Sequence, residues 1–423
     1  MKYMGSKRSM LQNGLGEAIA SATPGAKRFI DLFTGSASVA WHVAQGFDVP
    51  VIASDLQSFA VVLANSVLLR RVPLAETVFE EWLGRATVQA TSRDIFKLAD
   101  ENQKSIGTKD ISAVADQARR ICESSRFIIT SAYGGFYFSP LQSIWLDSFR
   151  STLPIDQQER NVCLAALIWA ASRAAAAPGH TAQPFKPNLT AGRFLKEAWN
   201  KDVVVLLRSS FDHIRSLYSR CIGEASVNDA NKVATSLQEG DLAFIDPPYS
   251  SVHYSRFYHV LETLTTYETF VASGQGRYPP PQDRPQSQYS QQKNSLEALQ
   301  SLFRSISSAG ASAIVTFPAG AASNGISGED VLDAATDYFH IQSAKVSGRF
   351  STMGGNRKHR QARMNSEELI LTLSKKAGSR NKINDLNSVG VNTDQLGNFP
   401  HEDSSEIHLQ TAAQISSAGK IIN

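Results

Sequence analysis

The four residues Asp246-Pro247-Pro248-Tyr249 directly follow the apolar run Leu242–Ile245. Because proline cannot donate a hydrogen bond to a sheet ladder, the strand must end at Asp246. The turn then exposes a carboxylate, a proline carbonyl and an aromatic face at the carboxyl edge of a parallel sheet, where ligands bind. The two oxygens suit a planar base that carries an exocyclic amino group, with Tyr249 stacked on its ring. A plain strand-terminating turn is the alternative interpretation.

A second cluster, DLFTGSAS at residues 31–38, joins a short apolar run to a helical segment. Gly35 can adopt a positive φ, and the helix N-terminus offers free N–H groups to a ligand. Twenty residues further on, Asp55 ends the next apolar run. In a doubly wound fold an acid at that place binds ribose hydroxyls, so the spacing predicts a nucleotide-like cofactor. An ordinary strand–helix turn with a solvated acid is the alternative.

The elements that position these residues alternate between strand and helix. Residues 1–75 have two apolar runs ending in an acid, each followed by a helical segment, and later strand signals occur at 224–230, 241–250, 311–317 and 368–374. This order predicts an α/β fold with a Rossmann-like, mostly parallel sheet and helices on both faces.

Three other regions differ in composition. Helical periodicity at 116–133 and 159–177 predicts a mainly helical insertion over 76–220, so that 1–75 and 221–375 form one domain. Residues 277–293 contain too many Pro and Gln to pack and are expected to form a mobile loop. Residues 376–423 are expected to be a poorly ordered tail.

Composition excludes several classes of protein. The 423 residues contain 42 Lys+Arg and 39 Asp+Glu, a net charge of +3, so contact with nucleic acid requires local basic patches. The N-terminus has no apolar run typical of a secretory signal, and the most apolar stretch, Val162–Ala171, is too short to span a bilayer. The three cysteines have no CxxC spacing, so we expect free thiols in a cytoplasmic protein and no bound metal.

The motifs occur in an order that resembles the DNA adenine methylases, alpha-type N(6)-adenine-specific DNA methyltransferases that use S-adenosylmethionine. KYMGSK (2–7) resembles their N-terminal cofactor motif, DLFTGSAS their cofactor turn, GHTAQPF (179–185) their glycine-rich hairpin, and DPPY their catalytic motif. The segment 347–363 resembles their closing basic segment. Together these motifs cover about residues 1–375. Ala37 stands where the family has its second turn glycine, and the helical insertion and the loop after Tyr258 match no relative that would give a target sequence.

The resemblance implies a site-specific enzyme that transfers a methyl group to the exocyclic amine of a flipped adenine in double-stranded DNA. It implies a bacterial, nucleoid-associated location in the cytoplasm, a restriction-modification, phage or orphan setting, and room for a partner restriction endonuclease. The helical insertion would recognise the target. The implied catalytic residues are Asp246, Pro247, Pro248 and Tyr249, and the implied cofactor-binding residues are Tyr3, Lys7, Asp31, Phe33, Gly35, Asp55 and Asp246.

Two alternatives within the enzyme class stay open, because the same turn suits any planar amine: methylation of the cytosine exocyclic amine or of adenine in rRNA. A third alternative is an inactive DNA-binding protein with a methyltransferase fold. The presence of both Asp246 and Lys7 argues against that reading, since decayed enzymes usually lose such residues.

Contact with DNA requires positive charge, and the basic run from 349 to 363 is a candidate for gripping phosphates. A solvated surface loop is the alternative for this run. His180 in the hairpin can either touch DNA or make a structural hydrogen bond, and Phe257 or Tyr258 can join Tyr249 in stacking on the flipped base. The basic candidates are Arg349, Arg357, Lys358 and Arg360.

Overall fold

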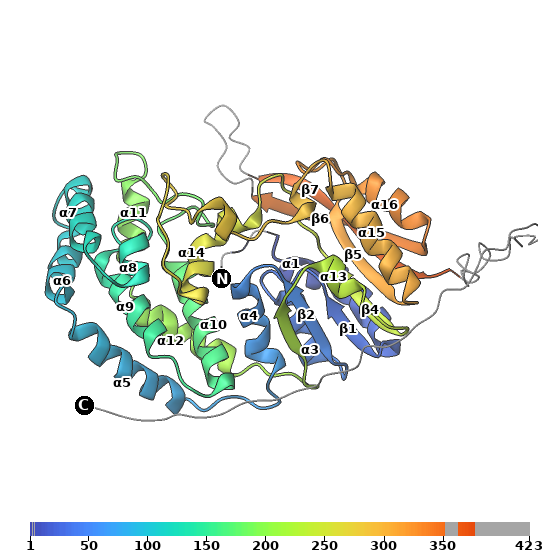
Figure 1. Cartoon of the computed structure of the whole chain (residues 1–423), viewed down its shortest axis with the longest axis horizontal. Helices are drawn as coiled ribbons and strands as arrows, with labels where there is room; N and C mark the ends of the chain where they lie inside the picture. Colours follow the sequence, from blue (N-terminus) through green and yellow to red (C-terminus); the bar gives the residue numbers. More distant parts are fainter. Residues whose placement is uncertain (2, 4, 352–362, 377–423) are drawn as a thin grey trace, which may run out of the picture. The chain divides into compact units, whose positions relative to one another are not determined.

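The computed structural model describes residues 1, 3, 5–351 and 363–376, with the side chains of 348–351 and 363–366 outside the description. A seven-stranded sheet has the order β3-β2-β1-β4-β5-β7-β6 (Figure 1). Strands β1 to β5 pair in parallel, and β7 pairs antiparallel with both β5 and β6. The predicted mostly parallel α/β sheet is therefore confirmed. The strands are β1 (Arg28–Asp31), β2 (Val51–Asp55), β3 (Glu224–Val227), β4 (Asp241–Ile245), β5 (Ser312–Pro318), β6 (Phe339–Ser351) and β7 (Arg363–Lys375).

Both faces of the sheet are covered, which explains why the central strand β4 is apolar without interruption from Leu242 to Ile245. In β4, Leu242 and Phe244 join one core, whereas Ala243 and Ile245 join a second core on the opposite face. The first core includes α2 (Leu15–Ala22), α3 (Ser38–Gly46), α4 (Ser58–Leu68) and α14 (Tyr254–Thr266), with the short α1 (Arg8–Leu11) and η1 (Thr23–Gly25) nearby in the chain. The second core includes α13 (Ala230–Ala234), α15 (Ser295–Ser308) and α16 (Gly328–Thr336).

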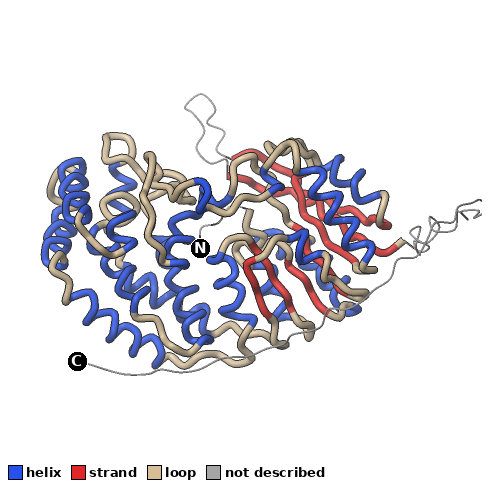
Figure 2. The backbone as a smooth tube through the Cα atoms, in the orientation of Figure 1, coloured by secondary structure: helices blue, strands red, loops and turns tan. Residues whose placement is uncertain are grey.

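A group of helices follows α4 in the chain and lies to the left of the strands in Figure 2. The longest of them, α10, packs against α4, α12 and α14, so its apolar residues belong to the same core as one face of the sheet. Residues 1–376 form one compact unit, and a separate domain for 76–220 stays a prediction. These helices are α5 (Thr77–Thr91), α6 (Phe96–Ser105), α7 (Ile111–Glu123), α8 (Ile128–Tyr133), α9 (Pro140–Ser151), α10 (Gln157–Ala174), α11 (Gly192–Trp199) and α12 (Val203–Arg215).

The segment 116–133, whose periodicity indicates helix, is divided between two helices. Helix α7 ends at Glu123 and α8 begins at Ile128. The buried carboxylate of Asp147 accepts hydrogen bonds from the backbone N–H groups of Ile129 and Thr130, which stabilises a new helix start. A tertiary contact of this kind leaves no local signal in the sequence.

Strand β6 was not predicted, because it is an edge strand in which few positions are apolar. The segment 347–363 that resembles a closing basic segment therefore includes the end of β6 and the first residue of β7. The backbone of Arg349 lies in β6, and its side chain lies outside the description. Arg357, Lys358 and Arg360 lie outside the described residues, as does the predicted tail from 377 onward.

The expectation that residues 277–293 cannot pack against the rest of the protein is wrong. This segment contains the short helices η2 (Pro281–Asp283) and η3 (Gln288–Ser290). Tyr289 is only 2% exposed, and its hydroxyl donates a 2.6 Å hydrogen bond to Asn231 Oδ1. One buried aromatic ring is enough to anchor a segment that is otherwise polar.

None of the helices in the described residues has both the length and the apolar character needed to cross a bilayer. In the same part of the chain, no three His, Cys, Asp or Glu side chains are grouped so that they could hold a metal ion.

Candidate active site

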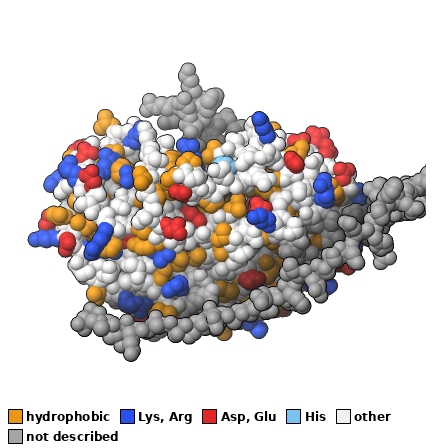
Figure 3. All heavy atoms as spheres, in the orientation of Figure 1, with side chains coloured by type: hydrophobic (Ala, Val, Ile, Leu, Met, Phe, Trp, Pro, Cys, Tyr) orange, Lys and Arg blue, Asp and Glu red, His pale blue; other side chains and the backbone are white. Residues whose placement is uncertain are grey.

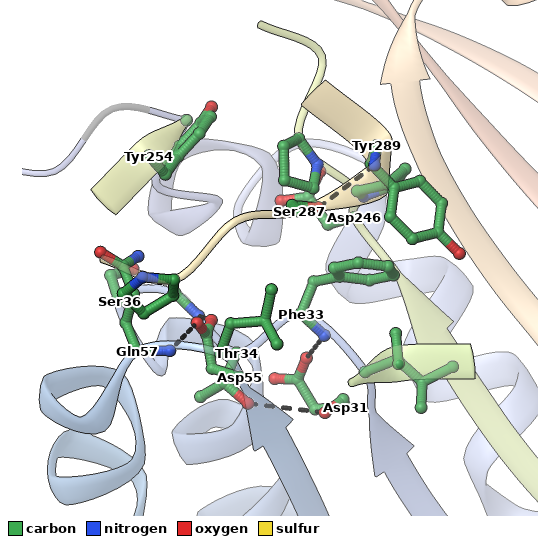
Figure 4. A pocket seen from close by; sticks show the side chains of 18 of the residues that line it. Asp31, Phe33, Thr34, Ser36, Asp55, Gln57, Asp246, Tyr254, Ser287 and Tyr289 are labelled. Carbon is green, nitrogen blue, oxygen red and sulfur yellow. Dashed lines mark hydrogen bonds between the residues drawn. The ribbon is translucent and has the colours of Figure 1, made fainter. Parts of the chain in front are cut away.

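One pocket lies at the carboxyl ends of β1, β2 and β4, the edge of a parallel sheet at which ligands bind. In Figure 4, Asp31 and Asp55 lie on one side of it, and Asp246 and Tyr254 lie on the other. The pocket brings together every residue predicted for catalysis or cofactor binding. These are Tyr3, Lys7, Asp31, Phe33, Gly35, Asp55, Asp246, Pro247, Pro248 and Tyr249.

The catalytic turn is held by a buried charge network. Asp246 Oδ1 lies 2.9 Å from Lys7 Nζ and accepts a 2.9 Å hydrogen bond from the Thr316 hydroxyl on β5. Lys7 Nζ also lies 3.3 Å from Glu368 Oε2 on β7. Sequence reasoning missed Thr316 and Glu368, because only the pairing of β4, β5 and β7 brings them beside the turn.

One cation therefore serves two carboxylates in this network. Burial raises the pKa of Asp246 and of Glu368, and Lys7 opposes that rise in both. Burial alone would lower the pKa of Lys7, but the two carboxylates outweigh it and raise that pKa. Lys7 thus stays charged. Because Lys7 is paired with both carboxylates, the negative charge of Glu368 affects the pKa of Asp246.

We expect Glu368→Gln to shift the acidic limb of the pH dependence of activity at this site to lower pH. Removing a negative charge leaves Lys7 to Asp246 alone, which lowers the pKa of Asp246. The measurement is the single-turnover rate as a function of pH. Glu367→Gln is the matched control, because Glu367 is the exposed neighbour on the same strand. An unshifted limb in Glu368→Gln would show that Lys7 does not transmit this charge.

The turn after β1 is bound to the end of β2 through Asp55. Asp55 Oδ2 accepts a 2.8 Å hydrogen bond from the Gly35 N–H, and Oδ1 accepts a 2.9 Å bond from the Gln57 N–H. Burial raises the pKa of Asp55 to about 6, although these two N–H groups oppose the rise. Asp55 therefore fixes the turn and also lines the pocket.

Gly35 is required by its conformation and by its neighbour. Its φ is +52°, and a Cβ at this position would lie 2.8 Å from Tyr3 Oη. Ala37, at the place of the family's second glycine, has a φ of 60°, so the turn keeps its left-handed conformation with alanine there.

Gly35→Ala is expected to lower the free energy of unfolding by about 1–2 kcal/mol, the cost of the left-handed conformation, and to weaken cofactor binding as Tyr3 moves. Thermal melts and cofactor titration are the measurements. Gly46→Ala is the control at the other end of α3, where an added Cβ meets nothing within 4 Å. Equal effects of the two substitutions would contradict the argument.

Asp31 is the most buried acid of the pocket, at 1% exposure. Its carboxylate accepts a long 3.4 Å hydrogen bond from the Phe33 N–H. Burial therefore dominates, and with help from Asp246 and Asp55 it raises the pKa of Asp31 to about 8. A neutral buried acid at the pocket wall can become a carboxylate when a cation enters.

Several lining residues carried no recognised sequence signal. Gln57 is buried, and its Oε1 has no hydrogen-bond partner among the described residues. This orphan acceptor suits an N–H or O–H group of a ligand. The signal in the sequence that could have identified Gln57 is its position two residues after Asp55. Further lining residues that the sequence reading missed are Asn228, Asp229 and Ala230 after β3, His253 and Tyr254 at the start of α14, and Pro285, Ser287 and Tyr289 from the 277–293 segment.

The aromatic residues expected to stack on a base have different surroundings. Tyr249 lines the pocket, where its ring lies edge-on to Phe317. Tyr258 is buried and stacks on Tyr3, with ring centroids 4.6 Å apart. Phe257 packs edge-on against His180 and does not line the pocket. Tyr249 is therefore the member of this set that faces the pocket.

Helix α14 links the two halves of the pocket. Its Glu262 carboxylate accepts hydrogen bonds of 2.9 and 3.1 Å from the backbone N–H groups of Ser58 and Phe59 at the start of α4. Helix α4 directly follows Asp55, and α14 directly follows the catalytic turn. The helix is also kinked at Tyr258, the residue that stacks on Tyr3.

His180 lies outside the main pocket. Its Nδ1 accepts a 3.1 Å hydrogen bond from the Ala182 N–H, and burial lowers its pKa. The structural hydrogen bond weighed for this residue is therefore present, and its contact with DNA stays a prediction.

The sheet order, and the pocket across the carboxyl ends of the parallel strands, are those of a Rossmann-like α/β fold. Residues 3–131 match the model of the D12 class N6 adenine-specific DNA methyltransferase family, which confirms the resemblance seen in the motifs.

Two curated proteins are also similar. Modification methylase LlaI from Lactococcus lactis subsp. lactis is 24% identical over 314 residues, covering 72% of this chain and 44% of that protein. Type II methyltransferase M.FokI from Planomicrobium okeanokoites is 25% identical over 285 residues, covering 63% of this chain and 37% of that protein. The chain thus spans less than half the length of the curated relatives it matches.

Proposed function

We propose that this protein is an adenine-specific DNA methyltransferase that uses S-adenosylmethionine. The observation that carries the proposal is the single pocket shared by the Asp246–Tyr249 turn and the Gly35 turn, in a chain whose first part matches an adenine methyltransferase family. Such a pocket can hold a cofactor and a base side by side.

The pocket fits this cofactor in two ways. The buried Asp31 carboxyl can balance a cationic group, and the orphan Gln57 Oε1 can accept a hydrogen bond. Asp55 would accept a hydrogen bond from a ribose hydroxyl. When bound, S-adenosylmethionine supplies an electrophilic methyl group.

Asp246 would act on the amine of the target base. Thr316 and Lys7 both approach Oδ1, so among the described residues Oδ2 is the oxygen left to accept an amine hydrogen. A second amine hydrogen would bond to the Pro247 carbonyl. The two bonds localise the nitrogen lone pair and orient it for attack. As the N–C bond forms, the nitrogen loses a proton, and the Asp246 carboxylate can take it because its pKa is raised.

The base must leave the duplex to reach Asp246, at a cost of a few kcal/mol. Tyr249, which lines the pocket, would offset part of this cost by stacking on the base. We further propose that residues 76–220 read the target sequence. The names of the type II and modification relatives support a restriction-modification setting with a partner endonuclease in the bacterial cytoplasm.

Incubation of the full chain with methyl-labelled S-adenosylmethionine and double-stranded DNA tests the proposal. The expected result is label in N6-methyladenine after digestion to nucleosides. Parallel reactions contain RNA or DNA without adenine. Label found only in cytosine, only in RNA, or in no base would overturn the proposal.

A further inference from the structure

We propose that Arg256 and Arg284, which share the ring of Tyr278 at the edge of the pocket, bind a backbone phosphate of the DNA strand whose base enters the pocket. This inference rests on the proposed function, and it adds a contact that the sequence motifs did not indicate. We refer to Arg256, Tyr278 and Arg284 as the arginine clamp.

The geometry of the arginine clamp places two positive charges together. Arg256 Cζ lies 4.8 Å from the centroid of the Tyr278 ring, and Arg284 Cζ lies 5.5 Å from the same centroid. Arg256 Nε also donates a 3.3 Å hydrogen bond to Tyr278 Oη. Burial lowers the pKa of Arg284, and the charge of Arg256 lowers it further. The ring therefore orients two guanidinium groups that repel each other, and an anion between them would relieve that repulsion.

These two charges have no acidic partner among the described residues, where no carboxylate lies within 4.0 Å of either guanidinium. Other partly exposed arginines, such as Arg208 and Arg220, do pair with an acid. In addition, Arg284 Nε is buried and has no hydrogen-bond partner in the described part of the chain. A buried N–H without an acceptor is a donor prepared for an oxygen ligand.

The arginine clamp lies next to the pocket in two separate segments. Ser255, which precedes Arg256, and Pro285, which follows Arg284, both line the pocket. The two segments are joined by a 3.2 Å hydrogen bond from the Ser287 N–H to His253 Nδ1. Each arginine is therefore the immediate sequence neighbour of a residue that lines the pocket.

The third member of the clamp connects it to the predicted hairpin. The Tyr278 hydroxyl donates a hydrogen bond to the carbonyl of Ala182, within the segment 179–185 that resembles the family's glycine-rich hairpin. Tyr278 is thus fixed between the hairpin and the segment that carries Arg284.

A phosphodiester fits this site better than other anions. Guanidinium forks match phosphate oxygens, and a nucleotide whose base occupies the pocket necessarily brings its own phosphates to the pocket edge. On the face shown in Figure 3, acidic and basic side chains are interspersed without a large patch of one sign. Grip on DNA then depends on local unpaired charges such as these.

The test is the salt dependence of DNA binding by the full chain, measured by fluorescence anisotropy with a labelled mixed-sequence duplex. We expect the double variant Arg256→Ala/Arg284→Ala to bind about tenfold more weakly at about 0.1 M salt, with a log–log salt slope smaller by about 1, as for one lost phosphate contact. Arg304→Ala is the matched control, because Arg304 is an exposed arginine whose Nε donates to a tyrosine hydroxyl, Tyr338, away from the pocket. Cofactor affinity is expected to be unchanged in both.

A double variant with the salt slope and affinity of the wild type would overturn the clamp. The variant Arg256→Lys/Arg284→Lys is a second test, because it keeps both positive charges. We expect it to keep the wild-type salt slope. A slope as small as that of the alanine variant would contradict a charge-based contact. Methylation assays separate the two proposals. If the alanine double variant binds DNA as the wild type does, and the wild-type chain methylates DNA, only this inference fails. If DNA binding depends on the two arginines but the wild-type chain transfers no methyl group, only the proposed function fails.

Discussion

Asp246→Ala is expected to reduce the rate of methyl transfer by about a thousandfold or more, since it removes the acceptor that orients the amine and takes its proton. The protein is expected to fold, because Asp246 lies just after the end of β4 with a side chain that is 17% exposed, and Lys7 keeps Glu368 as a partner. Single-turnover transfer to DNA, together with a thermal melt and a cofactor titration, measures the effect.

Thr316→Val is the graded control for this substitution. It removes one hydrogen bond to Asp246 Oδ1 and leaves the carboxylate in place, so we expect a loss of about tenfold, equivalent to a bond to a charged group worth about 1.5 kcal/mol. Transfer by Asp246→Ala within tenfold of wild type would remove Asp246 from the mechanism. A collapsed melting transition in Asp246→Ala would instead assign it a structural role.

Asp31→Asn is expected to stabilise the protein at alkaline pH. The unfolded carboxyl ionises near 3.8, whereas the folded one holds its proton up to about 8. The folded state therefore binds more protons between these values, and the stability that Asp31 contributes is present below pH 3.8 and lost as pH rises through 8. Because one pKa unit corresponds to about 1.4 kcal/mol, the variant is expected to gain up to roughly 6 kcal/mol relative to wild type above pH 8.

The same variant is expected to bind the cofactor more weakly, because a cationic ligand would draw the proton off Asp31. Wild-type affinity should rise from pH 6 to pH 8 with release of a proton, and the affinity of Asp31→Asn should be flat over this range. Calorimetry in buffers of different ionisation enthalpy measures the proton. Asp48→Asn, at an exposed acid paired with Arg220, is the control. Proton release that persists in Asp31→Asn would assign the titration to another group.

The sequence predicted those parts of the fold and the site that are set by neighbouring residues. Strands β1, β2 and β4 are buried on both faces and read as apolar runs, so Asp31, Asp55 and Asp246 could be placed at their carboxyl ends. Strand β6 is a polar edge, and the break between α7 and α8 depends on Asp147 from α9, so neither had a local signal.

The partners of the predicted site residues were equally hidden. Lys7 meets Glu368 only because β7 enters the sheet beside β5, and nothing around Glu368 marks it as a partner. The same holds for Arg256 and Arg284, which both contact the ring of Tyr278. Tyr278 lies between them in the sequence, but nothing in the sequence indicates this contact. Motifs identify the functional groups at strand ends. Which distant charged residues pair with those groups is set by the tertiary structure.

The Glu262 carboxylate that holds the start of α4 has a consequence for how two bound ligands affect each other's affinity. It fastens the helix behind the catalytic turn to the helix behind Asp55, so a shift on either side must be accommodated by the other. We therefore expect cooperativity between the methyl donor and the nucleic acid. Thermodynamic reciprocity then requires that each ligand tighten the other by the same factor, whichever arrives first.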